Sequence, residues 1–274
     1  MKFLLFIVFT CVTSHVAAKT VTINSGRVSL SGVYLAPNKP IGPAVLLLHG
    51  CNRLAKQQTP SYERTMKMAS LLQEMGFGVL MLDVLGPKGK RQGCVGRTNK
   101  KSIGLRANDA QIAIAWLKAR NEVDASKIAV IGWAEGASTV LSLMNRSNPG
   151  VKSAVAFYPN CRLFLGLKNY RVAAPTLLLI GEEGETAAAE YCRELGLKSG
   201  QDLFHKVSYS DAEHDFASAD IAPIKKSSNS SGAKAVSQSN SAAAQDAWRR
   251  SFKWISRWFD PERSIQGIPP SNLP

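Results

Sequence analysis

Short apolar runs alternate along this chain with longer segments of helical periodicity. The runs are typical of strands buried on both faces, and they predict strands at 44–50, 78–84, 127–132, 153–159, 174–182 and 203–209. Apolar residues at helical spacing predict helices at 61–76, 105–120, 136–146 and 242–259. This alternation predicts a mostly parallel central sheet flanked by helices on both faces. Residues 20–37 alternate apolar and polar positions across a Ser-Gly turn, which predicts an N-terminal antiparallel hairpin.

Two of the predicted helices have a defined apolar side. In 105–120 this side is formed by Leu105, Ala113, Trp116 and Leu117. In 242–259 it is formed by Trp248, Phe252, Ile255 and Phe259. We expect the second set to pack on the core rather than on a membrane, because a final helix normally covers a sheet.

One segment fits neither pattern. Residues 221–244 are rich in Ser, Ala and Lys and nearly free of large apolar side chains. Such a composition buries little surface, so we predict a flexible loop at about 220–243. The loop follows His214 closely, and it is either a solvated insertion or a lid over a pocket.

The N-terminus has the features of a signal peptide. Lys2 precedes an apolar run from Phe3 to Val12, and small residues end at Ala18. We predict a signal peptide at 1–18 and one domain at 19–274, periplasmic or secreted after cleavage. An uncleaved anchor or a buried first strand is the alternative. No later stretch is apolar enough for stable membrane insertion.

Four cysteines remain after the predicted cleavage site: Cys51, Cys94, Cys161 and Cys192. An even number in an exported chain suggests disulfides, and three pairings are possible. Free buried thiols are the alternative if the chain is not exported.

The chain is basic, with a formal net charge of +14. Part of this charge clusters between residues 88 and 106, where it would attract anionic partners. Nucleic acid is the partner we least expect, because the sequence has no helical basic stripe, zinc motif or aromatic platform. A basic, solvated surface is the simpler interpretation.

The segment 127–144 has the form of a nucleophile elbow. A buried strand leads through a turn between Gly132 and Gly136 into an apolar helix. Such turns present a Ser or Cys nucleophile, but the central residue here is Ala134. The backbone N–H of Glu135 is a candidate oxyanion donor, and the N–H of Cys51, after an earlier strand, is the second.

Several polar residues follow predicted strands at the carboxyl edge of the sheet, where such sheets bind ligands. They are His49, Asp83, the acidic cluster 182–185 and His214. His214 follows the last strand, in the position of a catalytic base, whereas His205 lies inside that strand.

Taken together, "LLLHGCN", "GPKGKRQGC", "LRANDAQIAIAWL", "IGWAEGAS", "AFYPNC", "LLLIGE", "EHDF" and "AAAQDAWRRSFKWISRWF" resemble the dienelactone hydrolase family of α/β hydrolases, in its exported branch. The resemblance covers nearly all of 19–274. It implies the α/β-hydrolase fold and a Ser or Cys, Asp and His triad that hydrolyses esters or lactones without metal or cofactor. It also implies the disulfides Cys51–Cys94 and Cys161–Cys192.

Two triad positions depart from the family pattern. Ala134 occupies the nucleophile position, and Gly184 stands where the family has Asp. Glu185, one residue later, is the tentative acid, whereas Glu183 is one residue early. Natural loss of the nucleophile, an engineered Ser-to-Ala change and a nucleophile displaced to Ser138 or Cys51 are the competing explanations.

The sequence therefore predicts a dienelactone hydrolase-like pocket with His214 as base and weak or absent hydrolysis of esters or lactones. The alternative is a non-catalytic exported protein that binds a small anionic or ester-like ligand, favoured by the basic rim 88–101. A third possibility is association with a surface through the C-terminal helix and through the loop from Leu85 to about Ser102, which is rich in Gly and basic residues. The oligomeric state is not predicted.

Overall fold

The computed structural model describes residues 18–50, 60–83, 98–183, 186–199, 202–218 and 231–259 of the 274-residue chain. Several predicted features lie outside the described residues: positions 1–17 of the signal peptide, the bridge Cys51–Cys94, most of the basic cluster, Gly184 and Glu185.

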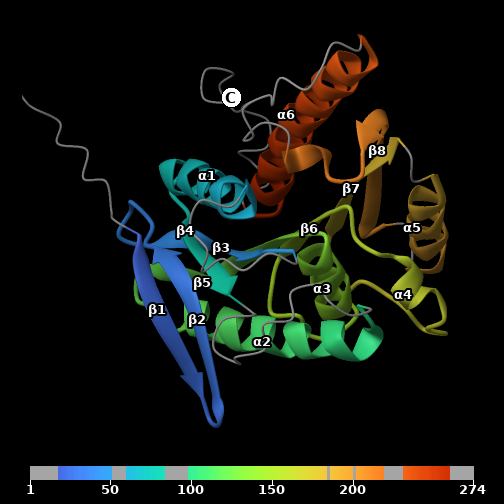
Figure 1. Ribbon diagram of the computed structural model, residues 1–274. Coiled ribbons are helices and arrows are strands. Elements are labelled where there is room, and N and C mark those ends of the chain that lie inside the picture. Colours follow the sequence, from blue (N-terminus) through green and yellow to red (C-terminus); the bar gives the residue numbers. More distant parts are fainter. Residues whose placement is uncertain are drawn as a thin grey trace, which may run out of the picture.

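An eight-stranded sheet runs through the described part of the molecule (Figure 1). Its strands are β1 (Lys19–Ser25), β2 (Val28–Leu35), β3 (Gly42–Leu48), β4 (Gly78–Asp83), β5 (Val123–Trp133), β6 (Ser153–Phe157), β7 (Thr176–Glu183) and β8 (Phe204–Glu213). They lie in the order β1-β2-β4-β3-β5-β6-β7-β8. β2 pairs antiparallel with β1 and β4, and all other neighbours are parallel. The predicted hairpin and the mostly parallel sheet are confirmed.

Helices cover both faces of this sheet (Figure 1). Helices α1 (Pro60–Glu74) and α6 (Ser231–Phe259) lie on one face, and α2 (Lys100–Lys118) and α3 (Glu135–Met144) lie on the other. Helix α5 (Thr186–Ser199) packs on β7, β8 and the short helix α4 (Arg162–Leu165), and the 3₁₀ turn η1 (Phe216–Ser218) packs on α6.

The central strands are apolar at successive positions because both of their faces are buried. Every residue of β4 and β6 is buried. In β3, Val45 and Leu47 join the core layer under α1 and α6, whereas Leu46 and Leu48 join the layer under α2 and α3. The alternation follows from the two-residue repeat of a strand. Because β3 to β8 run parallel, their carboxyl ends lie along the same edge of the sheet, and the candidate site is at this edge.

Helix α2 begins earlier than predicted, and its inner face differs. Asn99 caps it by a reciprocal pair of bonds with Ser102, so Lys100 and Lys101 belong to its first turn rather than to a loop. The prediction that Leu105 faces the sheet is wrong, because this side chain is 55% exposed. Its neighbour Arg106 is partly buried instead.

Helix α6 corrects the predicted loop at about 220–243. Residues 231–243 are helical, and residues 219–230 lie outside the described residues. The absence of large apolar side chains suggested a loop, but alanine is the strongest helix former. The small buried side chains of Ala243 and Ala244 let the helix approach the sheet, and Asn240 is buried with them.

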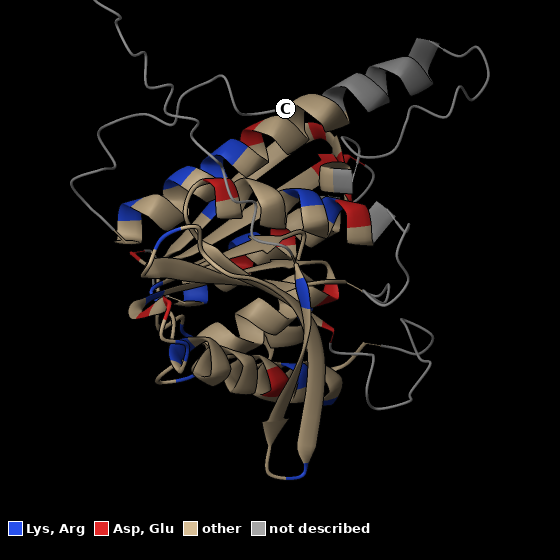
Figure 2. Ribbon diagram, turned by 90° about the vertical axis from the view of Figure 1, so that its left-hand side faces the viewer, with Lys and Arg blue, Asp and Glu red and all other residues tan. Residues whose placement is uncertain are grey.

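Between residues 240 and 259, the outer side of α6 carries Arg249, Arg250, Lys253 and Arg257 together with Asp246, whereas its inner face is apolar. The predicted core residues are all buried: Trp248, Phe252, Ile255 and Phe259. Figure 2 shows Lys and Arg recurring along the described half of α6. Elsewhere on this side, Lys and Arg are interspersed with Asp and Glu. Within the described residues, no helix is long and apolar enough to cross a bilayer.

Candidate active site

Ala134 lies at the apex of a tight turn between β5 and α3. Its backbone has φ 51° and ψ −115°, a conformation that residues with a β-carbon rarely adopt. The turn is held on both sides, since the Ala134 N–H donates to the Phe157 carbonyl at 3.1 Å and the Ser138 N–H donates to the Ala134 carbonyl at 2.9 Å. Strain retained at a single apex is typical of a strand–turn–helix elbow.

The two flanking glycines are required by close backbone contacts. A β-carbon on Gly132 would lie 2.4 Å from the Gly136 carbonyl oxygen. A β-carbon on Gly136 would lie 2.0 Å from the carbonyl oxygen of Leu48 at the end of β3. Neither backbone can yield without moving a strand. The G-x-x-x-G spacing is therefore a packing requirement that brings helix α3 against β3.

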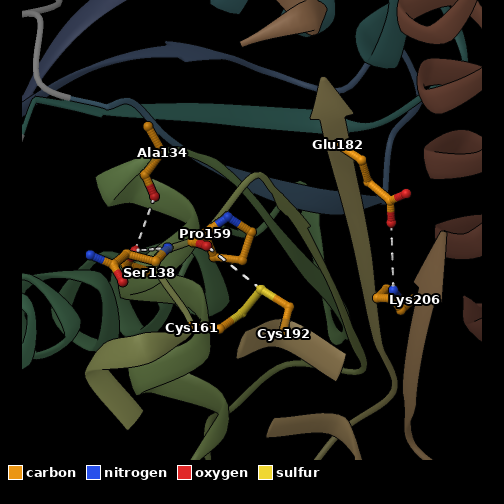
Figure 3. Close-up of a disulfide and its surroundings, with 8 residues drawn as sticks. Ala134, Ser138, Pro159, Cys161, Glu182, Cys192 and Lys206 are labelled. Atoms are coloured by element: carbon orange, nitrogen blue, oxygen red, sulfur yellow. Dashed lines mark hydrogen bonds and ion pairs between the residues drawn. A yellow bond between two sulfur atoms is a disulfide. The ribbon is translucent and has the colours of Figure 1, made fainter. Parts of the chain in front are cut away.

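Ser138, one turn into α3, uses its hydroxyl to brace the turn (Figure 3). The hydroxyl donates to the Ala134 carbonyl at 3.2 Å and accepts from the Asn160 N–H at 2.9 Å. The residue is almost fully buried. Together the two bonds link the segment after β6 to the elbow, so the hydroxyl of Ser138 has a structural role here.

The loop after β3 lies directly beside the elbow. A β-carbon on Gly50 would be 3.3 Å from the Ala134 methyl carbon and 3.8 Å from Oε2 of Glu135. Arg106, from helix α2, donates through Nη2 to the carbonyls of His49 at 2.9 Å and Gly50 at 3.1 Å. The start of this loop and the start of α3 are thereby brought together.

His49 is fully buried at the base of this loop. Its Nδ1 lies 2.8 Å from the Gly50 carbonyl oxygen, which can only accept, so Nδ1 carries the proton. Its Nε2 lies 3.6 Å from Oδ1 of Asp83. Burial lowers the pKa of His49, and Arg106 lowers it further, while Asp83 and the Gly50 carbonyl act in the opposite direction. We therefore treat His49 as a neutral ring that supports the loop.

Acidic residues surround Arg106. Burial lowers its pKa to about 10, while Glu135, Asp109 and Asp83 favour its charged form. It remains a cation at neutral pH. Oε1 of Glu135 accepts from the Thr98 hydroxyl at 3.3 Å, and Oε2 is buried with no hydrogen-bond donor among the described residues. The positive charge of Arg106 therefore interacts favourably with the Glu135 carboxylate.

A cavity of about 370 Å³ opens beside the elbow. Ala134 and His214 both line it, together with Glu135, Tyr158 and Arg162. His214 follows β8 immediately, and its ring centroid lies 5.2 Å from that of Tyr158. Tyr158 itself follows β6 and has a positive φ of 45°. Residues from the ends of β5, β6 and β8 thus meet at one opening, as strands of a parallel sheet permit.

A disulfide closes one wall of this cavity (Figure 3). Cys161, which lines the cavity, is bonded to Cys192 of α5, with the two Cα atoms 5.0 Å apart. Cys192 Sγ also lies 3.7 Å from the Pro159 carbonyl oxygen. A disulfide sulfur carries no hydrogen, so this is a packing contact. The bridge is the Cys161–Cys192 pair that the family resemblance implies.

The acidic cluster after β7 is only partly described. Oε1 of Glu182 lies 3.9 Å from Nζ of Lys206 in β8 (Figure 3). The next residue, Glu183, is exposed. The candidate acid Glu185 lies outside the described residues, as does the candidate oxyanion donor Cys51. No group of three or more potential metal ligands occurs among the residues that are described.

Arg106 and Tyr158 are the site residues that sequence reasoning missed. An arginine within a polar helix and a tyrosine at the end of an apolar strand carry no local signal of function. Only the Gly-rich elbow, the His after the last strand and the family motifs gave such signals.

Comparisons with known proteins agree with the fold. The dienelactone hydrolase from Anabaena variabilis ATCC 29413 superposes with a TM-score of 0.62 at 20% identity, covering 88% of this chain and 98% of its own. A dienelactone hydrolase-like promiscuous phosphotriesterase from metagenomic libraries gives 0.59 at 18% identity, over 88% and 98%. An esterase from Pyrococcus furiosus gives 0.59 at 17%, over 88% and 93%. At these identities the likeness shows the α/β-hydrolase fold alone.

No curated protein matches the sequence. The model of the dienelactone hydrolase family matches residues 30–259, which is most of the chain. The chain belongs to the dienelactone hydrolase family.

Proposed function

We propose that this protein carries a dienelactone hydrolase-type pocket for carboxylic ester or lactone substrates, and that Ala134 leaves its turnover weak or absent. One observation carries the proposal. The Ala134 methyl occupies the strained apex of the elbow and lines the same cavity as His214. An oxygen or sulfur nucleophile at that apex would face the base, and a methyl group cannot attack a carbonyl.

The roles of the base, the acid and the oxyanion donors follow from the protons that acyl transfer moves and from the negative charge that develops on the acyl oxygen. In a serine version, the hydroxyl attacks the acyl carbon while His214 takes its proton and passes it to the leaving alkoxide. Water then hydrolyses the acyl-enzyme to the free acid. The backbone N–H groups of Glu135 and Cys51 are the proposed oxyanion donors, and Glu185 is the proposed acid that orients His214. The Glu135 amide begins helix α3, where N–H groups have no acceptor within the helix.

Without the nucleophile, some rate enhancement can persist. Removal of a triad member typically leaves about 10³–10⁴-fold acceleration over water, from the oxyanion donors and substrate binding. We therefore expect a weak background rate rather than a normal esterase rate.

We further propose that the mature domain is exported after cleavage following Ala18. The Cys161–Cys192 disulfide supports this, because structural disulfides persist in oxidising compartments.

A binding protein is the second candidate. It is favoured by a cavity of about 370 Å³ that has a methyl group at its reactive position. Arg162 lines the same cavity, so a small anionic or ester-like ligand would find a cation there.

Ester hydrolysis by the parent protein and by Ala134→Ser, compared on 4-nitrophenyl acetate, tests the first candidate. Restored turnover that is lost again in Ala134→Ser/His214→Ala would support it. No turnover in Ala134→Ser would favour the binding protein, for which reversible thermal stabilisation by ligand is the expected signature.

A further inference from the structure

Arg106 binds the start of the loop after β3, which lies beside the elbow, through one guanidinium nitrogen. Its Nη2 donates to the His49 carbonyl at 2.9 Å and to the Gly50 carbonyl at 3.1 Å. The carboxylate of Glu135, the first residue of α3, lies close to the same loop, because its Oε2 would be 3.8 Å from a β-carbon on Gly50, and its charge favours the charged form of Arg106. The loop after β3 and the N-terminus of α3 are the two elements that carry the proposed oxyanion donors.

We propose that Arg106 is a positioning residue for oxyanion stabilisation, because it holds the carbonyls of His49 and Gly50 and thereby sets the orientation of the loop beside Ala134. This inference rests on the proposed ester or lactone hydrolysis at the same site.

Because a peptide unit is rigid, the hydrogen bonds from Arg106 to the two carbonyls also restrain the N–H groups of the same peptide units. A peptide unit is planar and trans, so its carbonyl and its N–H point in opposite directions. Fixing a carbonyl oxygen on Arg106 therefore fixes the plane of the whole unit. It also keeps two carbonyl oxygens on the guanidinium, away from any position where an oxyanion would be repelled by them.

The Gly50 carbonyl is held by two donors rather than one. His49 Nδ1 lies 2.8 Å from the same oxygen that Arg106 Nη2 reaches. A carbonyl oxygen has two lone pairs, so both are used. Gly50 also lies in contact distance of the apex, because a β-carbon there would be 3.3 Å from the Ala134 methyl carbon. The Gly50 carbonyl, beside the reactive position, is thus held more firmly than the His49 carbonyl, for which one side-chain donor is seen among the described residues.

Lysine at this position would keep the charge but not the contacts. Its terminal nitrogen is one bond closer to the backbone than Nη2, so both bonds would stretch beyond hydrogen-bond range. Arg106→Lys therefore separates positioning from the effect of a nearby positive charge. Arg106→Met removes both, and it leaves Glu135 without its counter-charge.

Arg146 provides a matched control on the other side of α2. It donates to Asn108 Oδ1 at 2.8 Å and to the Gly104 carbonyl at 3.4 Å, and it also bonds Gln111. Its side-chain hydrogen bonds within the described residues all go to α2, and none goes to His49 or Gly50. Arg146→Met should change stability alone.

The binding arm uses the parent protein, so it requires no turnover. Calorimetry at pH 8 compares methyl phenylacetate, a neutral ester, with methyl benzylphosphonate, its tetrahedral anionic counterpart. We expect the parent and Arg146→Met to bind the phosphonate more tightly than the ester. Arg106→Lys and Arg106→Met should lose at least about tenfold in phosphonate affinity, with ester affinity within about twofold. Circular dichroism and thermal melting establish that each variant is folded.

The kinetic arm uses the Ala134→Ser background on 4-nitrophenyl acetate. Adding Arg106→Lys should lower kcat at least about tenfold and leave KM within about twofold, because the lost interaction belongs to the transition state. If Arg106 had only a structural role, Arg106→Lys would lower the melting temperature without lowering kcat selectively relative to KM.

The outcomes separate the two proposals. If Ala134→Ser has no turnover while Arg106→Lys still loses phosphonate affinity, the proposed hydrolysis fails and the positioning role stands. If Arg106→Lys binds the phosphonate as the parent does, the positioning role is overturned, whatever Arg106→Met does. It is also overturned if the parent does not prefer the phosphonate, because there would be no oxyanion site to hold.

Discussion

The methyl group of Ala134 and the imidazole of His214 line one cavity, although they follow strands that are not neighbours in the sheet. β6 and β7 separate β5 from β8, and Tyr158 at the end of β6 contacts the His214 ring. The parallel strands between them bring the apex and the candidate base to the same edge. This relationship supports the proposal that position 134 is the nucleophile position of a hydrolase-type pocket.

The elbow should tolerate no side chain at its second glycine. Gly136→Ala places a β-carbon 2.0 Å from the Leu48 carbonyl oxygen, so strand or helix must move. We expect a loss of more than about 3 kcal/mol in unfolding free energy, or no folded protein. Gly104→Ala is the control, since nothing lies within 4 Å of a β-carbon at this helical position. It should stabilise the protein by about 0.5–1 kcal/mol. Urea denaturation measures both, and equal effects would contradict the packing argument.

Asn240 should affect both stability and the segment that carries His214. Its Oδ1 accepts from the Glu213 N–H at 2.8 Å, and its Nδ2 donates to Glu213 Oε2 at 2.9 Å. Asn240→Ala should cost about 1–3 kcal/mol, because a buried pair of bonds is lost. In the Ala134→Ser background it should also lower kcat, since Glu213 directly precedes His214.

Tyr209→Phe serves as its control, because the Tyr209 hydroxyl also ties β8 to α6, through Asp246 Oδ2 at 2.9 Å. This variant should lose about 0.5–1.5 kcal/mol and keep kcat. A fall in kcat that is the same in both variants would show that α6 acts through general stability.

The disulfide should contribute substantially to stability. Cys161 and Cys192 are 31 residues apart, and the loop-entropy relation gives about 3.7 kcal/mol for closing such a loop. A Cys161→Ala/Cys192→Ala double variant should lose an amount of this order in thermal or denaturant unfolding. Alkylation before reduction should label neither cysteine in the parent. Labelling of both without reductant would contradict the bridge.

Mild acid should destabilise the protein through His49. Burial holds the pKa of His49 below its unfolded value, so the unfolded chain binds more protons below about pH 6.5. The stability from this group is present above that pH and is lost as the pH falls, by up to about 1.4 kcal/mol per pH unit. His49→Asn keeps a donor for the Gly50 carbonyl and should reduce this slope. The same slope in His49→Asn as in the parent would contradict this assignment.

The sequence predicts elements whose apolar pattern repeats along one segment. It fails where the orientation of a side chain depends on partners that are distant in the chain. The apolar runs of β3 to β7 and the glycines of the elbow are visible in the sequence because packing repeats along one element. Leu105 and Arg106 show the opposite case. The leucine is exposed, and the arginine turns inward because the carbonyls of His49 and Gly50 and the charge of Glu135 lie there. No local pattern contains those partners.

Helix α6 was missed in part for a related reason. The composition of 231–243 resembles a loop, yet small residues suit a close approach to the sheet, and Asn240 has its partner on β8. The sequence contains the propensity, but only the fold supplies the surface against which the helix packs.

The most direct test is intact-mass spectrometry after treatment with a fluorophosphonate probe. We expect Ala134→Ser to gain one adduct, located on the peptide that contains position 134, and the parent to gain none. The Ala134→Ser/His214→Ala variant should label far more slowly, because the base is missing. An adduct on another residue of the parent, or no adduct on Ala134→Ser, would contradict the assignment of position 134 as the place of the nucleophile.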